Sequence, residues 1–92
     1  MYVILVYDIK TDEKGKKILP KVFKTCKKYL VHIQNSVFEG ELSKSQLKAL
    51  KIELSQLIRD KCDSLIIFKN RQEKWLEKEF LGIKDDLTDN FL

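Results

Sequence analysis

The chain lacks a long uninterrupted apolar run, and no stretch reaches the roughly 18 apolar residues of a membrane-spanning helix. Its first residues, MYVILVYDI, also lack the basic region and the small-residue cleavage site of a secretion signal. We therefore expect a cytoplasmic protein without membrane contact. Cysteine is sparse as well. Cys26 and Cys62 form neither a CxxC pair nor a metal-ligand spacing, so we interpret them as buried free thiols.

What is present is typical of one small folded domain. The chain has 92 residues, of which 43% are hydrophobic and 35% are charged, and this balance excludes a disordered protein. The net charge of +4 is unevenly distributed, because residues 10–28 are rich in lysine and residues 73–92 hold more acidic than basic residues. A basic block beside a turn suggests a polyanionic partner. A helix with a solvated lysine face would explain the same pattern.

The apolar periodicity predicts six elements in the order β-α-β-β-α-β. Residues 2–9 and 64–68 have the β-branched, apolar character of strands, and residues 31–42 are expected to form two short strands. Residues 14–30 have helical spacing, with a start near residue 17 that would place Pro20 in the first turns. A second helix opens at Ser43, where Ser43 and Gln46 have the spacing of a capping box.

This order is that of a ferredoxin-like α+β sandwich, in which two helices cover one face of a four-stranded sheet. We expect residues 1–69 to form this domain and residues 70–92 to form a tail that packs on a partner subunit. The first strand is apolar on both of its faces. In a sheet with one face in water, apolar and polar residues should instead alternate along each strand. A second copy of the chain is the simplest cover, so we expect a homodimer through the sheet faces.

Asp8 ends the apolar first strand, and its charge requires an explanation. The carboxylate lies at an exposed rim, caps the following turn, or holds a cation, since an unpaired buried charge is costly. If the face that carries Asp8 is the dimer face, two copies approach one axis and repel each other. A bound cation relieves that repulsion, and magnesium suits hard oxygen ligands.

Three segments of the sequence resemble one known family. These are VYDI at the end of the first strand, QNSVFEGEL before the second helix, and DSLIIF in the last strand. They resemble the small CRISPR-associated nucleases of spacer acquisition, the family called Cas two, over residues 1–69. The resemblance implies a ferredoxin-like homodimer with a magnesium-dependent endonuclease activity on RNA or DNA. It also implies a partner, the CRISPR integrase, whose dimers the family bridges while it binds the duplex between them.

The resemblance also assigns roles to individual residues. Asp8 is the implied catalytic residue and magnesium ligand, with Tyr7, His32 and Phe38 near the site. We interpret His32 as a partly exposed strand residue without a catalytic role, although it could act as a general acid or base. Where the family often has arginines, this chain has lysines, and we expect nucleic acid to bind at Lys10, Lys14, Lys16 and Lys17.

Two functions from different classes remain open on these residues. In one, paired Asp8 residues hydrolyse phosphodiester bonds of RNA or DNA with Mg²⁺. In the other, a basic dimer holds double-stranded DNA for the integrase and cuts nothing, which one acidic residue per chain slightly favours. A toxin-like RNA endonuclease, or a non-catalytic nucleic-acid-binding dimer of the same fold, is a further alternative. The expected nucleic-acid partner is double-stranded DNA, with single-stranded RNA as a second candidate. Glu39 and Glu41 share a strand face, and we expect them at its rim.

Overall fold

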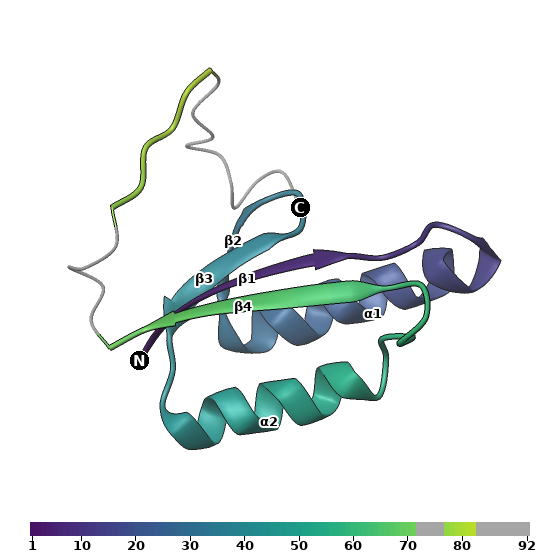
Figure 1. The fold of residues 1–92 in the computed structure, drawn as a ribbon, viewed down its shortest axis with the longest axis horizontal. Helices are drawn as coiled ribbons and strands as arrows, with labels where there is room; N and C mark the ends of the chain where they lie inside the picture. The colour runs from purple at the N-terminus through teal and green to yellow at the C-terminus, as the bar shows by residue number, and fades with distance from the viewer. Residues whose placement is uncertain (72–76, 83–92) are drawn as a thin grey trace.

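The computed structural model describes residues 1–71 and 77–82 of the chain. Its elements follow the predicted order and lie in two layers, a sheet and a pair of helices beneath it (Figure 1). The ferredoxin-like α+β prediction is therefore confirmed. None of the helices formed by the described residues has the length and apolar character that a membrane-spanning helix requires.

The sheet has four strands in the order β2-β3-β1-β4. Their bounds are Tyr2–Asp8 for β1, Val31–Gln34 for β2, Val37–Glu41 for β3 and Ser64–Asn70 for β4. All three pairings are antiparallel, and β1 lies between β3 and β4. The two short strands predicted within residues 31–42 are confirmed. They part at a turn where Asn35 has a positive φ of 42°, a conformation that asparagine tolerates better than most residues.

Helix α1 spans Glu13–Tyr29, so its predicted start near residue 17 is wrong. Asp12 caps it by accepting a hydrogen bond from the Gly15 amide at 2.7 Å. The earlier start places Pro20 inside the helix, where a proline leaves the carbonyl one turn before it without its helical partner. Packing of the apolar face of α1 on the sheet must offset that cost, which is about 3 kcal/mol.

Helix α2 spans Lys44–Ser55, and the predicted capping box is confirmed at its start. The Gln46 amide donates to Ser43 Oγ at 3.1 Å, and the Ser43 amide donates to the Gln46 side chain at 2.9 Å. Together these bonds satisfy two backbone groups that the helix itself leaves free.

The core lies between the two layers. Alternate residues of β1 point down onto the helices, and Val3 and Leu5 are fully buried there together with Phe38 of β3 and Leu50 of α2. Cys26 belongs to this core, whereas Cys62 is exposed, so the prediction of two buried thiols holds only for Cys26. The opposite face of the sheet, called here the open face, is covered by neither helix.

Candidate nucleic-acid-processing site

Asp8 is the last residue of β1, and its side chain is exposed. It pairs in register with Ser64, the first residue of β4. Because side chains alternate along a strand, Asp8 shares the open face with Ile4 and Val6, while Tyr7 points to the helices. The carboxylate therefore stands at one end of the uncovered face of the sheet.

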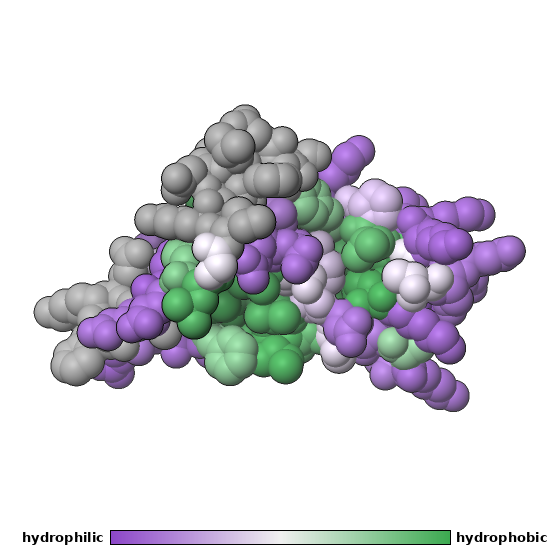
Figure 2. All heavy atoms as spheres, turned by 90° about the horizontal axis from the view of Figure 1, so that it is seen from above, coloured by the Kyte–Doolittle hydropathy of each residue, from purple (hydrophilic) through white to green (hydrophobic). Residues whose placement is uncertain are grey.

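The open face carries a hydrophobic patch, visible in Figure 2 between hydrophilic borders. Ile66 and Phe68 of β4 and Val31 of β2 are 52%, 56% and 56% exposed. Ile4 and Val6 of β1, which pair in register with Phe68 and Ile66, are only half-buried. Contiguous apolar patches of this kind on a small domain mark contact surfaces. The apolar residues of β1 that point away from the core therefore belong to a face that neither helix covers.

Glu39 and Glu41 lie on the same open face, as their strand spacing predicts, but far from Asp8. Glu39 pairs in register with Ile4, four residues before Asp8, which corresponds to about 13 Å along a strand. Glu39 is 8% exposed, accepts a hydrogen bond from the Tyr2 hydroxyl and forms an ion pair with Lys78. Glu41 pairs with the N-terminal amino group at 2.9 Å. Neither carboxylate joins Asp8 in one chain.

Lys78 belongs to the segment predicted to pack on a partner subunit. Its ion pair with Glu39 places it over the open face of its own chain. Residues 72–76 and 83–92, with most of the predicted tail, lie outside the described residues, so packing on a partner stays a prediction.

Tyr7, His32 and Phe38, which the resemblance places near the site, lie on the other face of the sheet. Phe23 of α1 completes their cluster: its ring centroid lies 4.9 Å from that of His32 and 5.4 Å from that of Phe38. The centroids of Tyr7 and Phe38 are 6.0 Å apart. Tyr7 is adjacent to Asp8 in the chain, yet the strand alternation separates this aromatic cluster from the carboxylate.

His32 is 7% exposed, so the expectation of a partly exposed histidine is wrong. Its Nε2 atom lies 2.8 Å from the Asn35 carbonyl oxygen, which can only accept, so Nε2 carries the proton. Nδ1 is buried and has no hydrogen-bond partner among the described residues. Burial also raises the pKa of Tyr7 to about 12, with a smaller contribution from Cys26. The cluster is buried between the sheet and α1, where it supports the fold.

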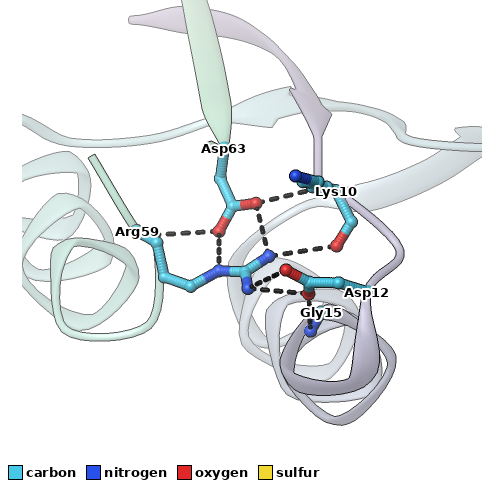
Figure 3. Close-up of polar contacts among 5 residues, drawn as sticks. All are labelled: Lys10, Asp12, Gly15, Arg59 and Asp63. Atoms are coloured by element: carbon cyan, nitrogen blue, oxygen red, sulfur yellow. Dashed lines mark hydrogen bonds and ion pairs between the residues drawn. The ribbon is translucent and has the colours of Figure 1, made fainter. Parts of the chain in front are cut away.

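A network around Arg59 holds the two chain connections next to Asp8 (Figure 3). Arg59 donates from Nε and Nη2 to the two carboxylate oxygens of Asp63, both at 2.9 Å. Its Nη1 donates to Asp12 at 2.7 and 3.0 Å, and its Nη2 also donates to the Lys10 carbonyl at 3.0 Å. Asp63 in turn accepts from the Lys10 amide at 2.9 Å. The connection after β1 is thus tied to the one before β4.

The network shifts the ionisation of its members in the direction that keeps them charged. Hydrogen bonds from Arg59 hold the pKa of the Asp63 carboxyl well below its usual range. The same side chain and the Gly15 amide lower the pKa of Asp12. Hydrogen bonds to the two aspartates raise the pKa of Arg59. These two carboxylates are committed to the guanidinium, which leaves Asp8 as the carboxylate at the end of β1 outside the network.

Gly15 allows the network to close. A Cβ atom at this position would lie 1.6 Å from the Lys10 carbonyl oxygen, the atom that accepts from Arg59. Only a residue without a side chain permits the start of α1 to approach the connection so closely. The sequence analysis assigned no role to Arg59 or to Gly15. One available signal was Asp63, a charged residue placed directly before the apolar run of β4.

The expected nucleic-acid-binding lysines lie near the same end of β1 as Asp8. Lys10 belongs to the connection after β1, and Lys14, Lys16 and Lys17 belong to the first turns of α1. All four are exposed and form no ion pair with any described residue. The exposed face of α1 continues the stripe at three- and four-residue intervals, through Lys21 and Lys24.

The described residues of a single chain do not provide a set of ligands for magnesium at Asp8. Within residues 1–71 and 77–82, no group of three or more histidine, cysteine or acidic side chains is placed to hold a metal ion. Asp8 supplies one carboxylate, and Asp12 and Asp63 are bonded to Arg59. Any ion at this position needs ligands from a second chain or from a substrate.

The comparisons with known proteins agree on one family. The family model described as CRISPR associated protein Cas2 matches residues 1–78. A protein of Fusobacterium nucleatum subsp. nucleatum, named CRISPR-associated endoribonuclease Cas2, is 61% identical over 92 residues, which is 100% of this chain and 87% of that protein. One from Moorella thermoacetica, named CRISPR-associated endoribonuclease Cas2 2, is 45% identical and covers 98% of this chain and 100% of its own length.

Solved structures support the same relationship. A crystal structure titled as that of cas2 superposes with a TM-score of 0.75 at 37% identity, over 94% of this chain and 91% of that chain. Streptococcus pyogenes Cas2, solved at pH 6.5, also has a TM-score of 0.75, at 33% identity, over 89% of this chain and 100% of its own. The sequence motifs, the fold and these matches lead to one conclusion: the chain belongs to the CRISPR-associated Cas2 family.

Proposed function

We propose that the protein is an endoribonuclease of CRISPR adaptation that works as a homodimer joined through its open faces. The observation that carries the proposal is the position of Asp8, an exposed carboxylate at the end of the apolar open face, which neither helix covers. Relatives up to 61% identical bear the name endoribonuclease, and the proposal extends that activity to this chain.

Dimerisation through the open face supplies the second carboxylate that one chain lacks. Burying Ile66 and Phe68, which are 52% and 56% exposed, removes apolar surface from water at about 25 cal/mol per Å². In a two-fold dimer each residue meets the same surface of its partner. Two Asp8 residues then border one interface, at the ends of the β1 strands.

Two carboxylates and several waters form a donor set that magnesium accepts. We therefore propose Mg²⁺ as the cofactor of the dimer, with one Asp8 from each chain as its protein ligands. When bound, the ion would neutralise charge on a phosphodiester group. The protein's own contribution is to fix the position of Asp8. The Arg59 network does this by tying the connection after β1 to the connection before β4.

Phosphate binding belongs to the lysines near that end. Lys14, Lys16 and Lys17 are exposed on the first turns of α1. A lysine binds phosphate as a point charge without the bidentate geometry of arginine. These residues therefore attract and hold the nucleic acid, whereas Asp8 acts at the bond that is cut.

A second candidate function rests on the same lysines. Because α1 covers the face of the sheet opposite the open face, its lysine stripe stays accessible in the proposed dimer. Such a dimer presents two basic surfaces, one on each outer side, which suits a protein that holds double-stranded DNA and bridges dimers of the CRISPR integrase. This adaptor role requires the lysines and does not require Asp8.

The test compares Asp8→Asn with Asp60→Asn in the full-length protein. Asp60 is an exposed aspartate in the connection before β4, so the control makes the same charge change near the same end of the sheet. With single-stranded RNA and Mg²⁺, we expect Asp8→Asn to lose at least about 100-fold in cleavage rate. Asp60→Asn should cleave within about two-fold of the unmodified protein.

The outcomes separate the two functions. Equal cleavage by Asp8→Asn and the unmodified protein contradicts the nuclease proposal. If neither protein cleaves RNA or DNA while both bind a duplex equally, the adaptor function stands alone. Loss of duplex binding in Asp8→Asn would contradict the assignment of phosphate contacts to the lysines.

A further inference from the structure

A recess lies at the same end of β1 as Asp8, on the helix side of the sheet. It has a volume of about 510 Å³ and is lined by Tyr7, Leu19, Pro20, Phe23, Asn35 and Ser36. It opens between the middle of α1 and the turn that joins β2 to β3. This volume falls within the range of roughly 300–1,000 Å³ that small-molecule sites occupy.

The chemistry of the lining suits a flat aromatic ring. Four of the six lining residues are aromatic or apolar: Tyr7 comes from β1, and Leu19, Pro20 and Phe23 come from α1. Tyr7 and Phe23 contribute aromatic rings to the lining. The other two, Asn35 and Ser36, bring an amide and a hydroxyl whose side chains form no hydrogen bond with the described residues. An apolar floor with a few polar groups at one edge is the usual form of a site that orients a heterocyclic ligand.

The polar edge is held in a fixed conformation. Asn35 adopts a φ of 42°, and its carbonyl accepts from His32 Nε2 at 2.8 Å. The Ser36 carbonyl accepts from the Tyr7 amide at 3.2 Å. Both backbone carbonyls thus accept hydrogen bonds from buried residues, while Asn35 is exposed and Ser36 is half-buried.

Positive charge lies on both sides of the recess along α1. Lys16 lies one helical turn before Pro20, and Lys24 lies one turn after it. Both lysines are exposed and form no ion pair with any described residue. A ligand that places a ring in the recess can therefore place phosphate groups beside either lysine.

The recess also has a defined relation to Asp8. Tyr7 forms one of its walls, and Asp8 follows directly in β1 with its side chain on the open face. Consecutive residues of a strand are about 3.8 Å apart at Cα, so the recess and the carboxylate lie on either side of one strand end. A chain of nucleotides that enters the recess on one side passes that end.

We propose that this recess binds the unpaired base of a single-stranded nucleic acid, stacked against Phe23 and contacted at its edge by Asn35 and Ser36. The inference rests on the proposed endoribonuclease function, for which it names a binding site for one base. Bases of a duplex are stacked and paired inside the helix and enter a side recess only after they are unpaired and flipped out, whereas a single strand has no pairing to break. Aromatic stacking accepts every base, so this site selects single strands more than it selects sequence.

The first experiment measures binding without cleavage. Amide resonances of the full-length protein are followed by NMR during titration with UMP, AMP or ribose 5-phosphate. We expect both nucleotides to shift the amides of Asn35, Ser36 and Tyr7. Ribose 5-phosphate, which has a phosphate and no base, should shift only the amides near the lysines. If ribose 5-phosphate shifts the turn amides as strongly as UMP does, the proposal is wrong.

Variants test the same recess in a longer ligand. Leu19→Trp fills the recess, and we expect it to weaken binding of a single-stranded oligoribonucleotide by about five-fold or more. Asn35→Gly keeps the positive φ and removes the amide, and should weaken binding by a smaller factor. Ile52→Trp adds the same ring at an exposed residue of α2 and should leave affinity unchanged. Unchanged affinity in Leu19→Trp, with a melting temperature like that of the unmodified protein, overturns the proposal.

A failure here is distinguishable from a failure of the proposed function. An oligoribonucleotide with one abasic residue opposite the recess should be cleaved more slowly at the adjacent bond than the intact strand. If cleavage depends on Asp8 but every abasic position is cut at the intact rate, the nuclease function stands and the base site does not exist.

Discussion

Arg59 and Asp63 are joined by three hydrogen bonds of 2.9 Å, two from the guanidinium and one from the Arg59 amide. The Asp63 side chain is fully buried, and that of Arg59 is 21% exposed. A buried carboxylate is stable only when its oxygens are paired and hydrogen-bonded. Since Asp63 also accepts from the Lys10 amide, this pair fixes the connections at the end of the sheet that carries Asp8.

Replacing Asp63 by asparagine should make the protein less stable at neutral pH and less sensitive to acid. The folded-state pKa of Asp63 is lowered, so its contribution is fully present above the unfolded value of about 3.9 and is lost as pH falls through the folded value. We expect Asp63→Asn to cost about 1.5–3 kcal/mol at pH 7, as loss of hydrogen bonds to a charged group does. Thermal melts between pH 7 and pH 2.5 measure both effects.

The control for this acid effect is Asp60→Asn, which removes an exposed carboxylate from the same connection. Its melting curve should follow that of the unmodified protein at each pH. The stability gap between Asp63→Asn and the unmodified protein should narrow below about pH 4, because Asp63 is protonated there in the unfolded chain before it is protonated in the folded protein. A gap that stays constant down to pH 2.5 contradicts the role of the ionised carboxylate.

Gly15→Ala should destabilise the fold even though alanine favours helices. Alanine is about 1 kcal/mol better than glycine inside a helix, but its Cβ would lie 1.6 Å from the Lys10 carbonyl oxygen. The backbone must move to relieve that contact, so we expect the free energy of unfolding to fall by about 1–3 kcal/mol. Denaturant unfolding gives the value.

Gly40→Ala is the matched comparison. There the added Cβ would lie 3.1 Å from the end of the Leu30 side chain, which can move. This variant should lose less stability than Gly15→Ala. If the two variants are equally stable, the close approach at Gly15 does not limit the fold.

The sequence predicted the fold well because its local signals agree with its packing. Apolar spacing placed both helices and all four strands, and the Ser43 capping box was correct. The start of α1 was missed because Pro20 was read as a residue of the first turns, whereas the Asp12 cap and sheet packing carry the helix through it. Secondary-structure propensity is a weak prior when tertiary contacts oppose it.

The candidate site was only partly predictable. Asp8 stands out in the sequence because a charge interrupts an apolar strand, and strand alternation places it on the open face. The Arg59 network joins residues up to 53 positions apart, from Lys10 to Asp63, and no local pattern reports such contacts. His32 was misjudged because its burial depends on Phe23, a residue of α1 whose ring packs against it.

Dimerisation is tested by a charge on the open face. Phe68 is 56% exposed on β4 beside Ile4, and Phe68→Lys should convert the dimer to a monomer in sedimentation experiments at micromolar concentration. In a two-fold dimer the substitution buries an unpaired lysine on each side of the same interface. Removing these charges from water costs free energy of association. Ile52→Lys makes the same kind of change on the outer face of α2, where Ile52 is 51% exposed, and should remain dimeric. Dimers of equal strength in both variants contradict the open-face interface.

The lysines of the first turns of α1 should control nucleic-acid affinity and its salt dependence. Replacing Lys14, Lys16 and Lys17 by glutamine removes three positive charges from exposed positions without changing buried contacts. Each phosphate contact that is lost should lower the slope of log affinity against log salt by about 0.9 for a duplex and about 0.7 for a single strand. The affinity for all duplex sequences should fall alike, because phosphate contacts carry no base information.

The comparison is the triple variant of Lys44, Lys48 and Lys51 on α2, which has the same loss of charge and lies farther from Asp8 in the helix layer. If the α2 variant changes the slope and the α1 variant does not, the phosphate backbone runs along α2, and the lysines near Asp8 are only a solvated helix face.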